Sequence, residues 1–137
     1  MRIDLALDDV KITLKRGPCH GSCPVYELTV LGSGEVIYKG EAFVKEIGER
    51  RSSIPQKDVS KLLAYAMDMG FFELESGYYA LITDVAEHEV TVKIGDREKK
   101  VIDQSAAPIL LQRFESMIDR VCQSRKWVGT WEERKGL

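Results

Sequence analysis

The chain has 137 residues, of which 44% are hydrophobic and 31% are charged, and this composition is typical of a single globular domain with a hydrophobic core. Its formal net charge is −2, so we expect no nucleic-acid partner, because such a balance gives no long-range attraction to a phosphate backbone. No apolar run approaches the roughly 20 residues that a membrane span requires. The N-terminus is acidic and lacks the apolar core of a secretory signal, which predicts a cytoplasmic location.

The first third of the chain predicts a series of strands. Apolar and polar residues alternate from Val10 to Arg16, as in a strand with one buried face. Similar patterns, separated by breaks at Gly17-Pro18, Gly32-Ser33-Gly34 and Gly40, give four expected strands: 10–16, 25–31, 35–39 and 42–47. Most of the links between them are short, which favours antiparallel pairing.

A helix is expected after these strands, beginning at Ser53-Ile54-Pro55-Gln56. In a capping box, Ser53 would accept the backbone N–H of Gln56, whose side chain would reach back, and Pro55 suits a first turn. Gly70 ends the helix at the usual C-terminal position. Its predicted buried face consists of Val59, Leu62, Leu63, Ala66 and Met67.

The second half of the chain predicts two more strands and a second helix. Residues 75–87 are irregular, yet too apolar for a fully solvated loop, because they include Tyr78, Tyr79, Leu81 and Ile82. Alternating residues on both sides of the turn Gly95-Asp96 predict strands over 89–94 and 97–103. The second helix opens at Ser105 and Pro108. Its apolar face is expected to contain Leu110, Leu111, Phe114, Met117, Ile118 and Val121, with a buried, inert Cys122 beside them.

The predicted fold class is therefore α+β. The element order ββββ-α-ββ-α gives an antiparallel sheet of about six strands with both helices packed on one face. We expect one domain over residues 1–126. Residues 127–137 form a polar tail that contains Trp127 and Trp131, and that is either docked by these side chains or frayed.

The unusual part of the sequence is the stretch from Arg16 to Tyr26, which holds two of the three cysteines. Cys19 and Cys23 are four residues apart, so a turn centred on Gly21 could bring them to the distance of a disulfide, whereas an extended strand could not. A ring this small stabilises a fold only modestly, so stability alone is a weak reason for the pair.

Three interpretations of the cysteine pair remain open. The first is a dithiol–disulfide switch, in which Arg16 and His20 would favour the thiolate. The second is a zinc site that uses Cys19, Cys23 and His20, although a second pair of well-spaced ligands is absent from the sequence. The third is a structural or recognition loop, which the two cysteines close or pack.

No complete catalytic motif occurs in the sequence. Asp84 and Glu87 could form a carboxylate pair in the irregular region, but capping or turn roles explain them as well. His88 has the parity of an apolar strand face, where a lone histidine is usually a core or rim residue. We therefore expect a protein that is not an enzyme.

The cysteine stretch resembles the defining motif of an uncharacterised bacterial domain family, R-x-x-C-x-G-x-C-P-x-Y. Its positions in this chain are Arg16, Cys19, Gly21, Cys23, Pro24 and Tyr26. Weaker matches extend the resemblance over residues 10–121, at Tyr38, Gly40, Asp84, Pro108 and Leu111. The resemblance implies a small α+β domain with no established activity or ligand. Relatives often carry export or lipoprotein signals, so a periplasmic or exported location stays open.

Together these observations favour a non-enzymatic binding or interaction module with an unknown protein or small-molecule partner. Its expected surface is formed by loop 17–24 and the neighbouring loop 75–87, with Asp84 and His88 as contributors from the second loop. The alternative is a thiol-redox or zinc-dependent role centred on Cys19 and Cys23. Apart from that zinc, no cofactor is expected.

Overall fold

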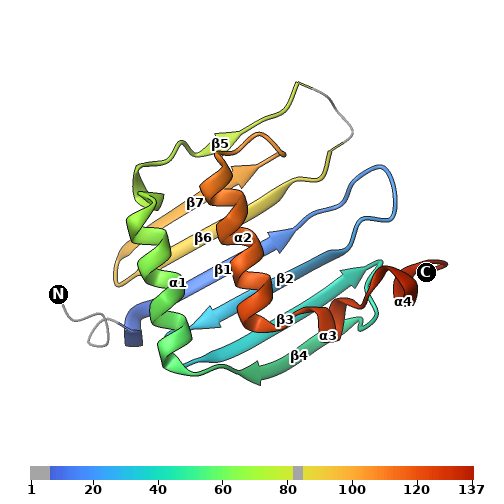
Figure 1. Cartoon of the computed structure of the whole chain (residues 1–137), viewed down its shortest axis with the longest axis horizontal. Helices are drawn as coiled ribbons and strands as arrows, with labels where there is room; N and C mark the ends of the chain where they lie inside the picture. The colour runs from blue at the N-terminus through green and yellow to red at the C-terminus, as the bar shows by residue number, and fades with distance from the viewer. Residues whose placement is uncertain (1–6, 82–84) are drawn as a thin grey trace.

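The computed structural model describes residues 7–81 and 85–137. In this part of the chain a seven-stranded sheet, ordered β4-β3-β2-β1-β6-β7-β5, carries helices α1 and α2 on one face (Figure 1). The strands are β1 Val10–Arg16, β2 Val25–Leu31, β3 Glu35–Ala42, β4 Gly48–Ser53, β5 Gly77–Tyr78, β6 His88–Ile94 and β7 Arg97–Asp103. The helices are α1 Gln56–Asp68, the 3₁₀ turn η2 Phe71–Glu73, α2 Ile109–Cys122, α3 Arg125–Val128 and α4 Trp131–Arg134.

The predicted α+β class and the placement of both long helices on one face are confirmed. Neighbouring strands pair antiparallel, except that β5 runs parallel to β7 at the sheet edge. The sequence did not predict β5, because a strand of two residues is too short to show an alternating pattern.

The prediction of a fourth strand over 42–47 is wrong. Strand β3 continues through Gly40 to Ala42, and the next strand is β4. The strand can pass through position 40 because glycine has no Cβ atom. A Cβ atom there would lie 2.2 Å from the carbonyl oxygen of Glu46 and 2.4 Å from the hydroxyl of Tyr38. Strand β4 was missed because it is a polar edge strand, GERRSS, without an apolar face.

The predicted capping box at the start of α1 is also wrong. Ser53 is the last residue of β4 and pairs with Glu35, so it is not positioned to cap the helix. Pro55 is the N-cap and has no side-chain hydrogen bond, while the side chain of Gln56 donates to the carbonyl of Gly32 at 3.1 Å. The end of α1 is as predicted, since Gly70 has a left-handed φ of 75°.

The core lies between the helices and one face of the sheet. Most residues of the two predicted apolar helix faces are buried, but Met67 and Leu110 are each 44% exposed. The fully buried side chains of α1 and α2 include Val59, Leu62, Ala66, Leu111, Phe114 and Ile118.

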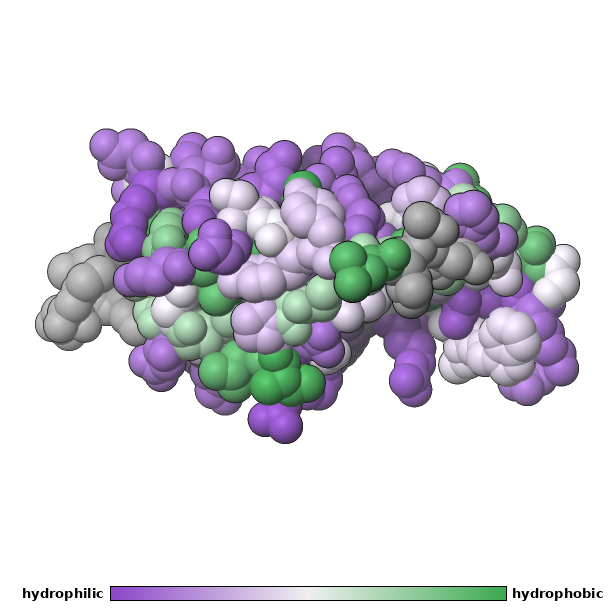
Figure 2. Space-filling view, turned by 90° about the horizontal axis from the view of Figure 1, so that it is seen from above, coloured by the Kyte–Doolittle hydropathy of each residue, from purple (hydrophilic) through white to green (hydrophobic). Residues whose placement is uncertain are grey.

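Within the described residues, no helix covers the opposite face of the sheet. Figure 2 shows hydrophilic side chains along this side of the molecule. Lysine, glutamate and threonine side chains from four strands line a shallow cleft there, including Lys11, Lys15, Glu27, Thr91, Lys93, Glu98 and Lys100. None of the helices in the described ranges is long and apolar enough to cross a membrane.

The two tryptophans of the C-terminal segment have different environments. Trp127 is 8% exposed and stacks on the ring of Tyr38, with 5.0 Å between the ring centroids. Trp131 is 62% exposed and begins α4, whose N-terminus has a capping box formed by Thr130 and Glu133. Of the two alternatives for this segment, docking is therefore observed for Trp127.

Candidate functional site

Loop 17–24 connects β1 to β2 and is closed by a disulfide between Cys19 and Cys23. The Cα atoms of these residues are 5.8 Å apart, and the exposed residues His20, Gly21 and Ser22 form the tip between them. The last register pair before the loop joins Arg16 to Tyr26. The disulfide therefore closes a hairpin whose base carries two of the candidate residues.

A second connection lies directly against this loop. The backbone N–H of Gly17 donates to the carbonyl of Glu87 at 2.9 Å. Only glycine fits at position 17, because a Cβ atom would lie 2.4 Å from that carbonyl oxygen. The two loops expected to share a surface are thus in contact at this point, whereas Ile82 and Asp84 lie outside the described residues.

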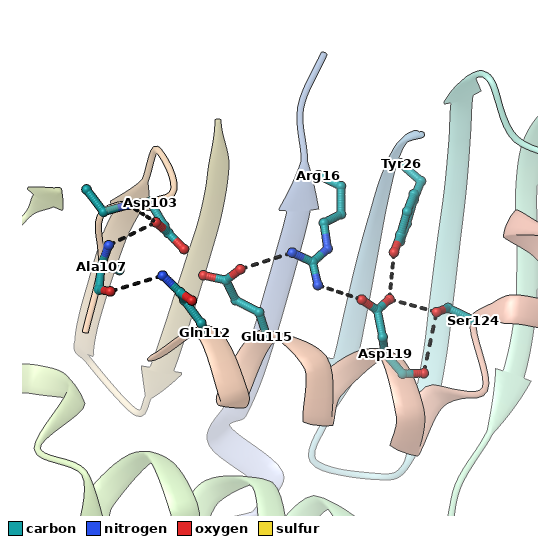
Figure 3. Close-up of polar contacts among 9 residues, drawn as sticks. Arg16, Tyr26, Asp103, Ala107, Gln112, Glu115, Asp119 and Ser124 are labelled. Atoms are coloured by element: carbon teal, nitrogen blue, oxygen red, sulfur yellow. Dashed lines mark hydrogen bonds and ion pairs between the residues drawn. The ribbon is translucent and has the colours of Figure 1, made fainter. Parts of the chain in front are cut away.

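Arg16 and Tyr26 hold the second half of α2 against the sheet (Figure 3). The guanidinium of Arg16 donates to Asp119 Oδ2 at 2.7 Å and to Glu115 Oε1 at 3.0 Å. The hydroxyls of Tyr26 and Ser124 each donate to Asp119 Oδ1 at 2.7 Å. Both oxygens of Asp119 are therefore satisfied by groups from β1, β2 and the turn after α2.

This network extends to the end of β7 through Glu115. The side chain of Glu115 is 4% exposed and lines one cleft together with Asp103. Asp103 is 1% exposed and accepts the backbone N–H groups of Ala106 and Ala107, both at 3.2 Å. Buried polar groups thus lie beneath α2 from β2 to the end of β7.

The network changes the acidity of its members. Burial lowers the pKa of Arg16, but Asp119, Tyr26 and Glu115 outweigh burial and raise this pKa above its ordinary value. Burial and the charge of Asp119 raise the pKa of Tyr26. Burial and Asp103 raise the pKa of Glu115 to about 9 despite the opposing charge of Arg16. Arg16 stays charged and Tyr26 stays neutral near neutral pH.

Two clefts lie on either side of Tyr26. One, of about 240 Å³, lies beside loop 17–24 and is lined by Pro18 and Val25 together with charged residues, among them Lys15, Glu27, Glu41, Glu87 and Glu89. The other, of about 580 Å³, lies between α2 and α3 and is lined by Asp119, Arg120, Ser124 and Arg125. Tyr26 lines both clefts, so a ligand in either one would lie beside the network.

The remaining candidates occupy different places. His88 lies across the strands from Arg16 and Asp103, and burial followed by the charge of Arg16 lowers its pKa. Its Nδ1 atom is buried without a hydrogen bond. Cys122 is buried as predicted, and burial raises its thiol pKa to about 12.

Within residues 7–81 and 85–137, no three His, Cys, Asp or Glu side chains are arranged to hold a metal ion. Because Cys19 and Cys23 are bonded to each other, their sulfur atoms are not available as thiolate ligands in this structure. A zinc site with His20 stays a prediction for the reduced protein.

Sequence reasoning missed the partners of Arg16 and Tyr26. The missed residues are Asp103, Glu115, Asp119 and Ser124, which come from β7, α2 and the turn after α2. One signal was present in the sequence. Glu115 is four residues after Leu111 and three before Ile118, so it is a charged residue on the predicted apolar face of the helix.

The chain belongs to a family described as a domain of unknown function, DUF6438, whose model matches residues 10–122. The matched region extends from the first residue of β1 to the last residue of α2, and so includes the cysteine loop and the residues that bind Arg16 and Tyr26. No curated protein matches the chain.

Proposed function

We propose that this domain is a non-enzymatic binding module and that loop 17–24 is the centre of its recognition surface. The observation that carries the proposal is the combination of an exposed tip with two fixed ends. His20, Gly21 and Ser22 are exposed, while the disulfide closes the loop directly behind them.

The loop is held in place before any partner binds. Besides the disulfide, the Gly17–Glu87 hydrogen bond ties one end of the loop to the neighbouring connection, and Arg16 and Tyr26 fix its base to α2. A preorganised loop loses less conformational entropy when it binds, so a larger part of the contact energy remains as affinity. This supports recognition by a rigid loop.

The surroundings of the loop support a protein partner in particular. The cleft beside the loop combines apolar surface from Pro18 and Val25 with charged groups of both signs. An extended segment of a partner could cover the tip and enter this cleft at once. Arg16 and Tyr26 act in this proposal as anchors, since their polar atoms are bound to Asp119 and Glu115.

Site-directed photo-crosslinking tests the proposal. A crosslinking residue at Ser22 is compared with one at Asp96, an exposed position in the β6–β7 turn at the opposite end of the sheet. We expect a specific partner at position 22 and not at 96, and the purified partner should bind the native protein more tightly than the Cys19→Ser/Cys23→Ser variant.

Two results would contradict the binding module. One is equal affinity of the purified partner for the native and double-serine proteins. The other is a catalytic turnover that the double-serine variant loses although its circular dichroism spectrum and unfolding midpoint are close to native.

A second candidate function, a thiol–disulfide switch, is favoured by one contact. The backbone N–H of Gly21 points at Cys19 Sγ at 3.3 Å, and the same N–H would stabilise a thiolate after reduction. An oxidising compartment would keep the disulfide closed, whereas a reducing one would favour the dithiol. A pH titration of the reduced protein tests the switch, and a Cys19 thiol pKa near the ordinary value of about 8.5 would argue against it.

A further inference from the structure

Two buried carboxyl groups lie side by side beneath α2. Asp103 ends β7, and Glu115 projects from the middle of the helix toward it (Figure 3). Both carboxyl groups line one cleft together with Arg16 and His88, and each side chain is almost completely buried. Two ionised carboxylates cannot form a hydrogen bond, because each offers only acceptor atoms. A direct contact between the two groups therefore needs a proton on one of them.

The hydrogen bonds around the pair indicate which group carries that proton. Asp103 Oδ1 accepts two backbone N–H groups, from Ala106 and Ala107, so Asp103 already serves as a hydrogen-bond acceptor. Glu115 Oε1 accepts from Arg16, whereas Glu115 Oε2 is buried and has no donor. A proton on Oε2 turns this orphaned atom into a donor to Asp103.

The charges around Glu115 lead to the same assignment. Arg16 faces it from β1, His88 from β6 and Asp103 from β7, while Asp119 lies one turn further along α2. Arg16 is the one permanent cation among these groups, and it is already paired with Asp119 at 2.7 Å. If every carboxyl were ionised, one cation would face three anions in a largely buried site, which is unfavourable.

We propose that Glu115 stays protonated at neutral pH and that its O–H donates a hydrogen bond to Asp103. A neutral carboxylic acid then holds α2 to the end of β7. Loss of this proton places two negative charges against each other and weakens the contact. The pair thus forms a contact between α2 and β7 that weakens at alkaline pH.

The sign of the pH effect follows from linkage. Burial and Asp103 raise the pKa of Glu115 to about 9 in the folded protein, above its ordinary value in an unfolded chain. Between these two values the folded state binds more protons than the unfolded state. Stability therefore falls as pH rises toward the folded-state pKa.

Replacement of Glu115 with Gln tests the proposed contact between Glu115 and Asp103. The amide of Glu115→Gln keeps an oxygen for Arg16 and supplies an N–H for Asp103, but it cannot ionise. We expect the urea midpoint of the native protein to fall between about pH 6 and pH 9, and that of the variant to stay nearly constant over the same range. Glu98→Gln, at an exposed glutamate, is the matched control and should retain the native slope.

A direct measurement covers the case in which Glu115→Gln does not fold. Carbon-13 NMR of the native protein follows the side-chain carboxyl carbon of Glu115 as the pH is raised. A titration midpoint above about pH 7 supports the proposal, and a midpoint below about pH 5 overturns it. A folded Glu115→Gln variant that keeps the native pH slope would also overturn it.

Discussion

Two connections at the same end of the sheet are held in place by different forces. Loop 17–24 is fixed by a disulfide and by charged contacts to α2. The connection 43–47 between β3 and β4 is fixed by the C-terminal segment instead. There the N–H groups of Lys45 and Glu46 donate to the carbonyls of Val128 and Trp127, both at 2.8 Å.

The two connections should therefore respond differently to redox state and pH. The contacts of loop 17–24 depend on redox state, and those at its base depend on the protonation of Glu115. The contacts of the connection 43–47 include backbone hydrogen bonds beside a stack of Tyr38 on Trp127, and an ion pair of Lys45 with Glu133 at 2.8 Å. Their hydrogen bond raises the pKa of Lys45 and lowers that of Glu133 to about 2, so none of these contacts changes with pH near neutrality. Reductant and alkaline pH should therefore loosen the first connection and leave the second in place.

The largest effect is expected from Arg16→Met. Removal of the guanidinium leaves Asp119 largely buried without its cation, and breaking such a pair costs about 3–5 kcal/mol of unfolding free energy. Urea unfolding measures the change. Arg51→Met is the control, because Arg51 pairs with Glu35 and Glu49 at the exposed edge, and its loss should have a much smaller effect. Equal effects would mean that the Arg16 network does not stabilise the fold.

The second connection should respond most to Trp127→Ala. The buried indole packs on Tyr38, so its removal should lower the unfolding free energy by about 3 kcal/mol. Trp131→Ala, at an exposed tryptophan, should change stability little. Hydrogen exchange should accelerate at Lys45 and Glu46 but not at Gly17. Faster exchange at Gly17 to the same extent would show that the two connections are not independent.

Removal of the disulfide should affect loop 17–24 rather than the connection 43–47. The Cys19→Ser/Cys23→Ser variant should be about 2 kcal/mol less stable, as expected for a small closed ring. Hydrogen exchange should accelerate at Gly17 while Lys45 and Glu46 keep their protection. If the amides of Lys45 and Glu46 lose protection as well, the disulfide stabilises the whole end of the sheet, and the two connections are not independent.

The sequence predicted the parts of this end that depend on local patterns. The strands that carry Arg16 and Tyr26 alternate clearly, and the spacing of Cys19 and Cys23 allowed the observed disulfide. The partners on α2 could not be predicted, because Asp119 lies 103 residues from Arg16 and 93 from Tyr26, and no local pattern specifies such a pairing. The polar strand β4 was missed for a similar reason, since its position depends on pairing with β3.

The smallest effects are expected from two tyrosine-to-phenylalanine substitutions, each of which removes one hydroxyl. Tyr26 donates to a carboxylate oxygen of Asp119 at 2.7 Å, and Tyr38 donates to the carbonyl of Glu46 at 2.8 Å. Hydrogen bonds to charged groups contribute more than neutral ones, so Tyr26→Phe should lower the unfolding free energy by about 1.5 kcal/mol and Tyr38→Phe by about 1 kcal/mol.

Replacement of the acceptor separates the two hydroxyls. Asp119 accepts from Tyr26, so the effect of Tyr26→Phe on the unfolding free energy should shrink in an Asp119→Ala background, whereas the effect of Tyr38→Phe should not change. An equal effect of Tyr26→Phe in both backgrounds would show that its hydroxyl does not stabilise the fold through Asp119.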